Sequence, residues 1–241
     1  MNGKVCVVTG SNTGIGKETA RGLAQRGARG VLAGRDVAKA EAARAEIAGT
    51  TGRDDVEVMA LDLASHASIR EFAARFAATH DRLDVLVNNA GLILLGSVDK
   101  ASYTDWRRVN AVNLDGVFLG CKHALPAIER AGGGSIVNIS SIAAMLGQPF
   151  AAAYGASKAG VSGLTKSVAV QCRQKKNGVR CNSVHPDGVK TPMVVKVATG
   201  QEDASRAEIE AIAQHSTRFC EPEDIANVVL FLASDESRAV N

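Results

Sequence analysis

The sequence predicts an α/β fold in which one doubly wound parallel sheet is covered by helices on both faces. Short runs rich in β-branched residues alternate with alanine-rich or apolar-periodic segments of helical length. Such alternation requires right-handed crossovers, which place helices on both sides of a parallel sheet. The 241 residues, of which 46% are hydrophobic, contain no repeat, low-complexity segment or linker. We therefore expect a single domain, residues 1–241.

The first half of the chain predicts four strands, each followed by a helix. Ser65 is expected to cap the third helix, because its hydroxyl can accept a hydrogen bond from a free amide of the first turn. The predicted strands are residues 3–9, 31–34, 56–61 and 83–87, and the predicted helices are residues 17–26, 36–47, 69–79 and 103–130.

The second half predicts two more strands and further helices. Glycines separate its first strand from the preceding helix, and Pro186 ends its second strand, because proline has no backbone N–H for the ladder. The predicted elements are a strand at 136–141, a helix from about 150 to 175, a strand at 179–185, a substrate flap of short helices at 187–216, and a last helix at 221–232.

Tyr154 and Lys158 lie four residues apart, so they share one face of the predicted helix. Such a pair is often merely solvated, but here small residues leave room for a molecule against the helix. A phenol has an ordinary pKa near ~10, which a nearby ammonium lowers. A hydroxyl of the pair Ser140 and Ser141 can hold a carbonyl oxygen while the tyrosine delivers a proton. These residues predict the acid–base half of a carbonyl reduction, with hydride supplied by a bound nucleotide.

A glycine loop follows the first predicted strand, with the spacing Thr9-Gly10-x-x-x-Gly14-x-Gly16. Gly10 permits a tight turn, Gly14 lets the backbone approach a phosphate, and Gly16 allows the helix to pack closely on the strand. The helix that starts here adds free amides and the positive end of its dipole. Glycine turns also serve geometry alone, but the strand–loop–helix context favours a dinucleotide site.

The composition argues against several other classes of protein. There are 28 Lys and Arg against 25 Asp and Glu, with no basic run, so we expect no nucleic-acid partner. No apolar run reaches ~18 residues and no signal peptide precedes the first strand, so we expect no membrane partner. Five scattered cysteines without a Cys-x-x-Cys pair predict reduced thiols in the cytoplasm. The five histidines show no metal-ligand spacing, so no metal is expected.

Taken together, the glycine loop, Asn88-Asn89-Ala90-Gly91, Ser141 and Tyr154-x-x-x-Lys158 resemble the short-chain dehydrogenase/reductase family. The resemblance implies a Rossmann-type fold and an NAD(P)-dependent alcohol dehydrogenase or ketoreductase. Family spacing favours Ser141 over Ser140. The implied catalytic residues are Asn113, Ser141, Tyr154 and Lys158. The implied cofactor-binding residues are Gly10, Ser11, Asn12, Thr13, Gly14, Ile15 and Gly16 on the glycine loop, Arg35 after the second strand, Asp62 and Leu63 at the adenine, Asn89, Val189 and Thr191 near the ribose and nicotinamide, and Tyr154 with Lys158.

Two polar residues have more than one interpretation. The resemblance gives Asn113 a water-holding role in a proton relay behind Lys158, whereas a helix-interior asparagine that binds backbone is the alternative. His185 invites a catalytic interpretation, but we expect a core histidine that orients its neighbours.

The choice of nicotinamide cofactor depends on Gly34-Arg35-Asp36. An acid at the end of the second strand would bind the ribose diol, and an arginine would suit a 2′-phosphate. Family alignment places Arg35 at that position, and its planar guanidinium pairs well with phosphate. Asp36 is expected to cap the next helix instead. Neither Asn12 nor Thr13 supplies the second basic residue of many NADP enzymes, but the sequence favours NADP over NAD.

The second half is most similar to bacterial 3β/17β-hydroxysteroid and cyclic-alcohol dehydrogenases, and the first half to retinol-dehydrogenase-type members. We therefore expect a small hydrophobic ketone or alcohol substrate, with a cyclic one favoured. Three apolar loops would wall its pocket, although they could also be core or subunit contacts. They are residues 92–95, 145–146 and 193–195.

Two departures from the family are visible. Asp187 stands where most members carry glycine, so the packing against the nicotinamide is expected to differ. The family usually adds a seventh strand after the last helix, whereas this sequence stops at Asn241; either a tail is missing or the sheet ends short. The resemblance also implies a homo-oligomer, a dimer or tetramer, that pairs through that tail and through helices around residues 103–130 and 155–175.

Two alternative functions use the same motifs. A catalytically silent nucleotide-binding redox sensor or regulator would predict the loss of Tyr154 or Lys158, and both are present. An extended-type sugar-nucleotide epimerase would need a separate substrate domain of roughly a hundred further residues.

Overall fold

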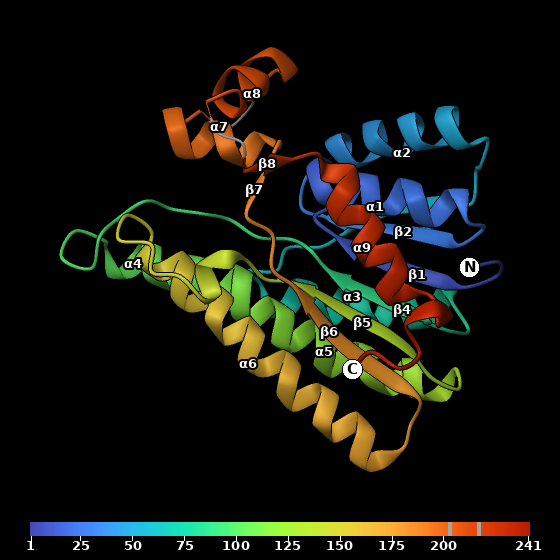
Figure 1. Ribbon diagram of the computed structural model, residues 1–241. Helices are drawn as coiled ribbons and strands as arrows, with labels where there is room; N and C mark the ends of the chain where they lie inside the picture. The colour runs from blue at the N-terminus through green and yellow to red at the C-terminus, as the bar shows by residue number, and fades with distance from the viewer. Residues whose placement is uncertain (202–203, 216–217) are drawn as a thin grey trace.

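A six-stranded, fully parallel sheet forms the centre of the computed structural model, which describes residues 1–201, 204–215 and 218–241 (Figure 1). Its strand order is β3-β2-β1-β4-β5-β6, so the chain reverses direction across the sheet between β1 and β4. The strands are β1 Val5–Thr9, β2 Arg29–Gly34, β3 Val56–Ala60, β4 Val85–Asn88, β5 Gly134–Ile139 and β6 Val179–Val184. This order confirms the doubly wound parallel sheet that the sequence predicts.

Helices cover both faces of the sheet, and each face has its own apolar core (Figure 1). The core on one face takes side chains from α1, α2 and α9, among them Leu23, Ile47 and Val229. The core on the other face takes side chains from α3, α5 and α6, among them Phe76, Ile128 and Val161. These helices are α1 Gly14–Gln25, α2 Val37–Thr51, α3 His66–Thr79, α5 Gly116–Arg130, α6 Ala152–Lys175 and α9 Pro222–Ala233.

Two side-chain caps expected from the sequence are present. Asp36 accepts a hydrogen bond of 3.0 Å from the Lys39 amide at the start of α2. Ser65 accepts one of 3.3 Å from the Ser68 amide and starts α3, which begins at His66 rather than at the expected residue 69. Both residues satisfy an amide that has no partner within the helix.

The expectation of one continuous α-helix over residues 103–130 was wrong. The segment consists of α4 Tyr103–Asn110, the π-helical turn η1 Ala111–Asp115, and α5. A π-helical turn inserts one residue without changing the apolar pattern much, so periodicity does not reveal it. Asn113 lies in this turn and is fully buried.

The segment after β6 stands away from the sheet and its two helical layers (Figure 1). It contains the short helices α7 Pro192–Thr199 and α8 Arg206–Ala213, as expected for residues 187–216 apart from 202–203 and 216, which lie outside the described residues. The sequence analysis missed a two-stranded parallel ladder at its base, β7 Gly188–Val189 with β8 Phe219–Cys220.

Oppositely charged pairs stand at both ends of this ladder. Asp187 accepts a hydrogen bond of 2.6 Å from Arg218, and Lys190 donates one of 2.6 Å to Glu221. Both pairs join residues 31 positions apart, which is the register of the strands between them. The two ends of the flap are therefore tied together by backbone and by charge.

The loops that leave β1, β4, β5 and β6 emerge at the same edge of the sheet, because the carboxyl ends of parallel strands coincide. The glycine loop, the segment after Asn88, the serine pair, Tyr154 and Lys158 lie on these loops or on the helices that follow them. At the outer edge, Asn241 accepts a hydrogen bond of 2.8 Å from the Cys181 amide of β6. Within the described residues, no helix combines the length and the apolar character that a membrane span needs.

Candidate active site

Tyr154 and Lys158 meet on α6, where the Lys158 ammonium nitrogen lies 5.7 Å from the centroid of the Tyr154 ring. The Lys158 side chain is almost fully buried, and its ammonium donates a hydrogen bond of 2.7 Å to the Ile139 carbonyl at the end of β5. This bond ties α6 to the strand that delivers the serine pair. The face of α6 that carries Tyr154 and Lys158 is therefore held against the carboxyl end of β5.

Burial controls the proton affinity of both side chains. It raises the pKa of the Tyr154 phenol, while a hydrogen bond with the Ser141 side chain acts in the opposite direction. Burial also lowers the pKa of the Lys158 ammonium to about 8. The expected lowering of the Tyr154 pKa was wrong in its net direction, because desolvation of the phenolate outweighs the hydrogen bond with Ser141.

The two serines of the pair have separate partners. Ser140 donates a hydrogen bond of 2.9 Å to the Lys158 carbonyl and is buried, as expected for a structural residue. Ser141 begins a 3-10 turn, η2 Ile142–Ala144, and its hydroxyl oxygen accepts a hydrogen bond of 3.1 Å from the Ala143 amide. The Ser141 side chain also forms a hydrogen bond with the Tyr154 phenol, so it belongs to the same site.

Asn113 uses its side-chain amide to tie the π-helical turn to the loop after β4. Its oxygen accepts a hydrogen bond of 2.9 Å from the Leu92 amide, and its nitrogen donates one of 2.9 Å to the Leu92 carbonyl. The same nitrogen donates a bond of 3.1 Å to Ser157, which donates in turn to the Tyr154 carbonyl at 2.7 Å. The side chain therefore binds backbone, as the alternative interpretation expected, and it links to the turn of α6 that carries Tyr154.

The glycine loop after β1 is shaped by contacts that only glycine allows. A Cβ on Gly10 would lie 2.7 Å from the Ala90 Cα, and one on Gly16 would lie 2.4 Å from the Gly10 carbonyl oxygen. Gly10 and Gly14 also have positive φ angles, 63° and 53°. The loop after β4 holds this backbone in place, because the Asn89 side-chain nitrogen donates hydrogen bonds to the carbonyls of Thr9 and Gly10 at 2.9 and 3.0 Å.

A nicotinamide dinucleotide fits these residues. Helix α1 begins at Gly14 without a side-chain cap, so the amides of its first turn have no side-chain acceptor and the positive end of the helix dipole faces the loop. A Cβ on Gly14 would lie 2.9 Å from a Thr191 methyl group, which places the start of the flap against the same loop. Such a crevice at the reversal point of a parallel sheet suits a pyrophosphate, with the nicotinamide toward Tyr154.

The other cofactor-binding residues expected from the sequence lie around this crevice or near it. Ser11 is buried and donates a hydrogen bond of 2.9 Å to the Val8 carbonyl, so its hydroxyl is engaged by the strand. Asp62 follows β3 and accepts a bond of 2.9 Å from the Ala64 amide. Arg35 is exposed directly after β2, while its neighbour Asp36 is used as a helix cap. Asn12, Thr13 and Ile15 lie on the loop and the start of α1, Leu63 packs near Gly116, and Val189 is buried in β7.

The apolar loops expected around a substrate differ in exposure. Leu95, Met145 and Leu146 are exposed, whereas Val195 is fully buried. A cavity of about 510 Å³ lies at the outer end of the loop after β4, next to the start of α6, and its lining includes Leu95 and Phe150. Leu95, Met145 and Leu146 therefore offer apolar surface, whereas Ile93 and Val195 are used in packing.

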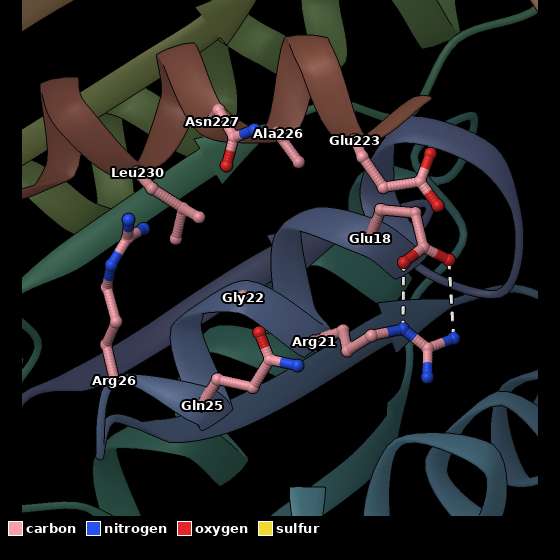
Figure 2. Close-up of a pocket in the computed structure, with 9 residues that line it drawn as sticks. All are labelled: Glu18, Arg21, Gly22, Gln25, Arg26, Glu223, Ala226, Asn227 and Leu230. Carbon is pink, nitrogen blue, oxygen red and sulfur yellow. Dashed lines mark hydrogen bonds and ion pairs between the residues drawn. The ribbon is translucent and has the colours of Figure 1, made fainter. Parts of the chain in front are cut away.

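A second cavity, of about 390 Å³, lies between α1 and α9 on one of the helical layers (Figure 2). The Glu18–Arg21 ion pair lies along it, and Leu230 from α9 packs over Gly22, where a Cβ would approach to 2.5 Å. It contains none of the motifs discussed above. Among the described residues there is also no group of three or more His, Cys, Asp or Glu that could hold a metal ion.

The sequence analysis assigned no role to two residues that shape the site. Thr9 accepts hydrogen bonds of 3.0 Å from the amides of both Asn89 and Ala90, which joins the two loops of the crevice. Ser157 is fully buried between Asn113 and Tyr154. The position of Thr9 directly before Gly10 could have indicated its role. Nothing in the sequence distinguishes Ser157 from the other small residues of α6.

The chain is similar to known proteins over nearly its whole length. A family model described as enoyl-(acyl carrier protein) reductase matches residues 10–241. Trans-4-hydroxycyclohexanecarboxylate dehydrogenase of Sinomonas cyclohexanicum is 40% identical over 97% of this chain and 87% of its own length. Cyclohexanol dehydrogenase of Acinetobacter sp. (strain SE19) is 38% identical over 100% of this chain and 91% of its own. The 3-beta-hydroxysteroid dehydrogenase of Comamonas testosteroni is 36% identical over 100% and 92%.

Solved structures agree over the whole chain. The crystal structure of levodione reductase superposes with a TM-score of 0.89 at 30% identity, covering 100% of this chain and 94% of that one. A protein from Beutenbergia cavernae, described as an NAD(P) dependent gluconate 5-dehydrogenase with bound NADP, has a TM-score of 0.87 at 35% identity over 100% and 93%. The fold, the site and these relatives agree, and the chain belongs to the short-chain dehydrogenase/reductase family of NAD(P)-dependent oxidoreductases.

Proposed function

We propose that this protein reduces a hydrophobic cyclic ketone, or oxidises the corresponding secondary alcohol, with NADP as the cofactor. The observation that carries the proposal is the meeting of Tyr154, Lys158 and Ser141 at the edge where the glycine loop opens. Relatives at 36–40% identity whose names specify cyclohexane-ring and steroid alcohols support the substrate class. No observation favours a silent redox sensor or an epimerase.

In the reduction direction, the Ser141 hydroxyl and the Tyr154 phenol would hold the ketone oxygen. The bound nicotinamide supplies the hydride. Tyr154 would give its proton to the oxygen as the alkoxide forms, and the raised pKa of this phenol keeps it protonated at neutral pH. Lys158 would hold the ribose and stabilise the phenolate left behind. Asn113 would support α6 through Ser157. It would also hold a water molecule in a proton relay behind Lys158.

The preference for NADP rests on Arg35. It lies exposed at the end of β2, where the adenine ribose of a dinucleotide is held in this fold, and Asp36 is occupied as the cap of α2. A guanidinium recognises a phosphate with paired hydrogen bonds. The similar structure with bound NADP and a 35% identical NADP-dependent (R)-specific alcohol dehydrogenase from Lentilactobacillus kefiri agree with this choice.

Further parts of the proposal concern the whole molecule. Residues 1–241 would act as one domain, with residues 187–216 closing over the substrate. Exposed apolar side chains on α4, α5 and α6, such as Trp106, Phe118 and Val170, suit a homo-oligomer, either a dimer or a tetramer. All five cysteines are free thiols, which suits the cytoplasm.

The experiment that tests the function measures oxidation of NADPH and of NADH against a panel of ketones, from acetone through cyclohexanone to bicyclic and steroidal ketones. We expect turnover with NADPH and with ring-containing ketones in preference to acyclic ones. Nucleotide binding is measured separately by titration of the cofactor fluorescence. Binding without turnover across the panel would contradict the proposed reaction and favour a regulatory role.

A further inference from the structure

His185 is a residue that the proposed mechanism does not use, although it reaches directly into the site. It follows β6, and its Nδ1 atom lies 3.2 Å from the carbonyl oxygen of Ser141. Its Nε2 atom lies 2.9 Å from the Ser183 hydroxyl oxygen. The imidazole therefore connects the end of β6 to the peptide of the serine that faces Tyr154.

The chemistry of these partners fixes the direction of both hydrogen bonds. A carbonyl oxygen only accepts, so Nδ1 of His185 must carry the hydrogen and donate to Ser141. In the neutral ring Nε2 is then an acceptor, and the Ser183 hydroxyl donates to it. The Ser141 carbonyl thereby fixes the tautomer, and the Ser183 hydroxyl, which can donate or accept, fits either state of Nε2.

The backbone around Ser141 is held on both sides of this contact. The Ser140 amide donates a hydrogen bond of 2.8 Å to the Val184 carbonyl, and the Ile142 amide donates one of 2.9 Å to the Pro186 carbonyl. Val184 and Pro186 are the two neighbours of His185. The imidazole thus binds the Ser141 carbonyl midway between two backbone contacts, and all three contacts join the same two segments.

We propose that His185 is a positioning residue, which holds the Ser141 peptide so that the Ser141 hydroxyl stays directed at Tyr154 and at the substrate oxygen. The inference rests on the function proposed above. The Ser141 hydroxyl has one further tether, the Ala143 amide at 3.1 Å, and that amide belongs to the turn that Ser141 itself begins. The His185 contact comes from the segment directly after β6 and, with the two backbone contacts, fixes the turn relative to the sheet.

Replacement by the two carboxamides separates this role from simple packing. The Nδ2 atom of asparagine stands where Nδ1 of histidine stands, whereas the Nε2 atom of glutamine stands where Nε2 stands. We expect His185→Ala and His185→Gln to lower kcat by about tenfold with the Kd for NADPH unchanged within twofold. His185→Asn should recover most of the lost kcat. Equal losses in the Asn and Gln variants would overturn the inference.

A double-mutant cycle with Ser141→Ala tests whether the histidine acts through the serine. The Ser141→Ala variant keeps the carbonyl that His185 binds and removes the hydroxyl that it positions. We expect His185→Ala to change kcat by less than twofold in this background. The same tenfold loss in both backgrounds would overturn the inference while leaving the proposed function intact. A Ser141→Ala variant with full activity would instead contradict the proposed function.

A spectroscopic measurement makes the test independent of any substrate. The chain has two tyrosines, Tyr103 and Tyr154, so the Tyr103→Phe variant leaves one phenol to titrate by absorbance at alkaline pH. The hydrogen bond with Ser141 favours the Tyr154 phenolate. Adding His185→Ala should therefore raise the midpoint of this titration, and His185→Asn should restore it. An unchanged midpoint in the alanine variant would also count against the inference.

Discussion

The ammonium of Lys158 faces the ring of Tyr154 at 5.7 Å, but its hydrogen bond goes to the Ile139 carbonyl. No direct hydrogen bond therefore joins the two residues, and burial shifts the pKa of each one separately. Burial raises the pKa of the phenol and lowers that of the ammonium to about 8. The pair holds a proton on the tyrosine at neutral pH, which is the state that a ketone reduction requires.

Replacing Tyr154 by Phe tests this assignment. The variant keeps the ring over Lys158 and removes only the hydroxyl, so we expect kcat to fall by roughly 10²- to 10⁴-fold, in line with the loss of a general acid. The Kd for NADPH should change by less than about threefold. The measurement is steady-state ketone reduction beside a fluorescence titration of the nucleotide. Unchanged turnover would rule out Tyr154 as the acid.

The buried ammonium predicts a pH dependence of stability. The Lys158 pKa is about 8 in the folded protein, against 10.5 for the ordinary group. Between these two values the unfolded chain binds more protons than the folded one, so this residue makes the folded state more stable as the pH rises from about 8 to about 10.5. Below pH 8 both states carry the charge, and the full cost of burying it remains.

The measurement compares the wild type with Lys158→Met by urea unfolding at several pH values. The difference in free energy of unfolding, wild type minus variant, should increase by up to roughly 3 kcal/mol from pH 8 to pH 10.5, because one pKa unit corresponds to ~1.4 kcal/mol. Lys166→Met, an exposed lysine on the same helix, should show no such trend. A constant difference between pH 7 and 10.5 would mean that Lys158 titrates normally.

The parts of the fold that were predicted correctly have local signals. Five of the six strands contain two or more β-branched residues, while β2 has only Val31 between its glycines and is the weakest signal. Asp36 and Ser65 each cap a helix by accepting a hydrogen bond from an amide three residues later, a pattern that is local in sequence. The spacing of Tyr154 and Lys158 was sufficient to place them on one helical face. The glycine loop was recognisable because its three glycines stand between a strand and a helix.

The parts that were missed depend on contacts distant in sequence. The π-helical turn at 111–115 is stabilised by the Asn113 amide on Leu92, 21 residues away, while its apolar period remains helical. The ladder of β7 and β8 has two residues in each strand, too few for a pattern. The shift of the Tyr154 pKa was expected in the wrong direction. The four-residue spacing identifies Lys158 as a neighbour, but it does not show how deeply the phenol is buried.

The charged ends of the β7–β8 ladder predict how firmly the flap is held. Asp187→Asn removes one pair, and because both side chains are largely exposed we expect a loss of at most about 1 kcal/mol. Limited proteolysis within residues 187–216 should become about two- to fivefold faster, with the midpoint of global unfolding nearly unchanged. Glu41→Gln removes a comparable exposed pair with Arg44 on α2 and should leave this cleavage rate as it is. At about 1 M salt the wild type and Asp187→Asn should be cleaved alike, since exposed pairs are screened. An identical rate at low salt would show that the ladder holds without the charges.

The choice between NADP and NAD is predicted to depend on Arg35. Changing Arg35 to Asp removes the group that would pair with a 2′-phosphate and supplies a carboxylate that can accept hydrogen bonds from a ribose diol. We expect the ratio of kcat/KM for NADPH to that for NADH to fall by at least about 100-fold, since both effects act in the same direction. Arg26→Asp makes the same change of charge beside the α1–α9 cavity of Figure 2, so it controls for the general field of the protein. The control should move the ratio by less than about threefold. A ratio that stays constant in Arg35→Asp would assign the discrimination to another residue, and equal shifts in both variants would assign it to net charge alone.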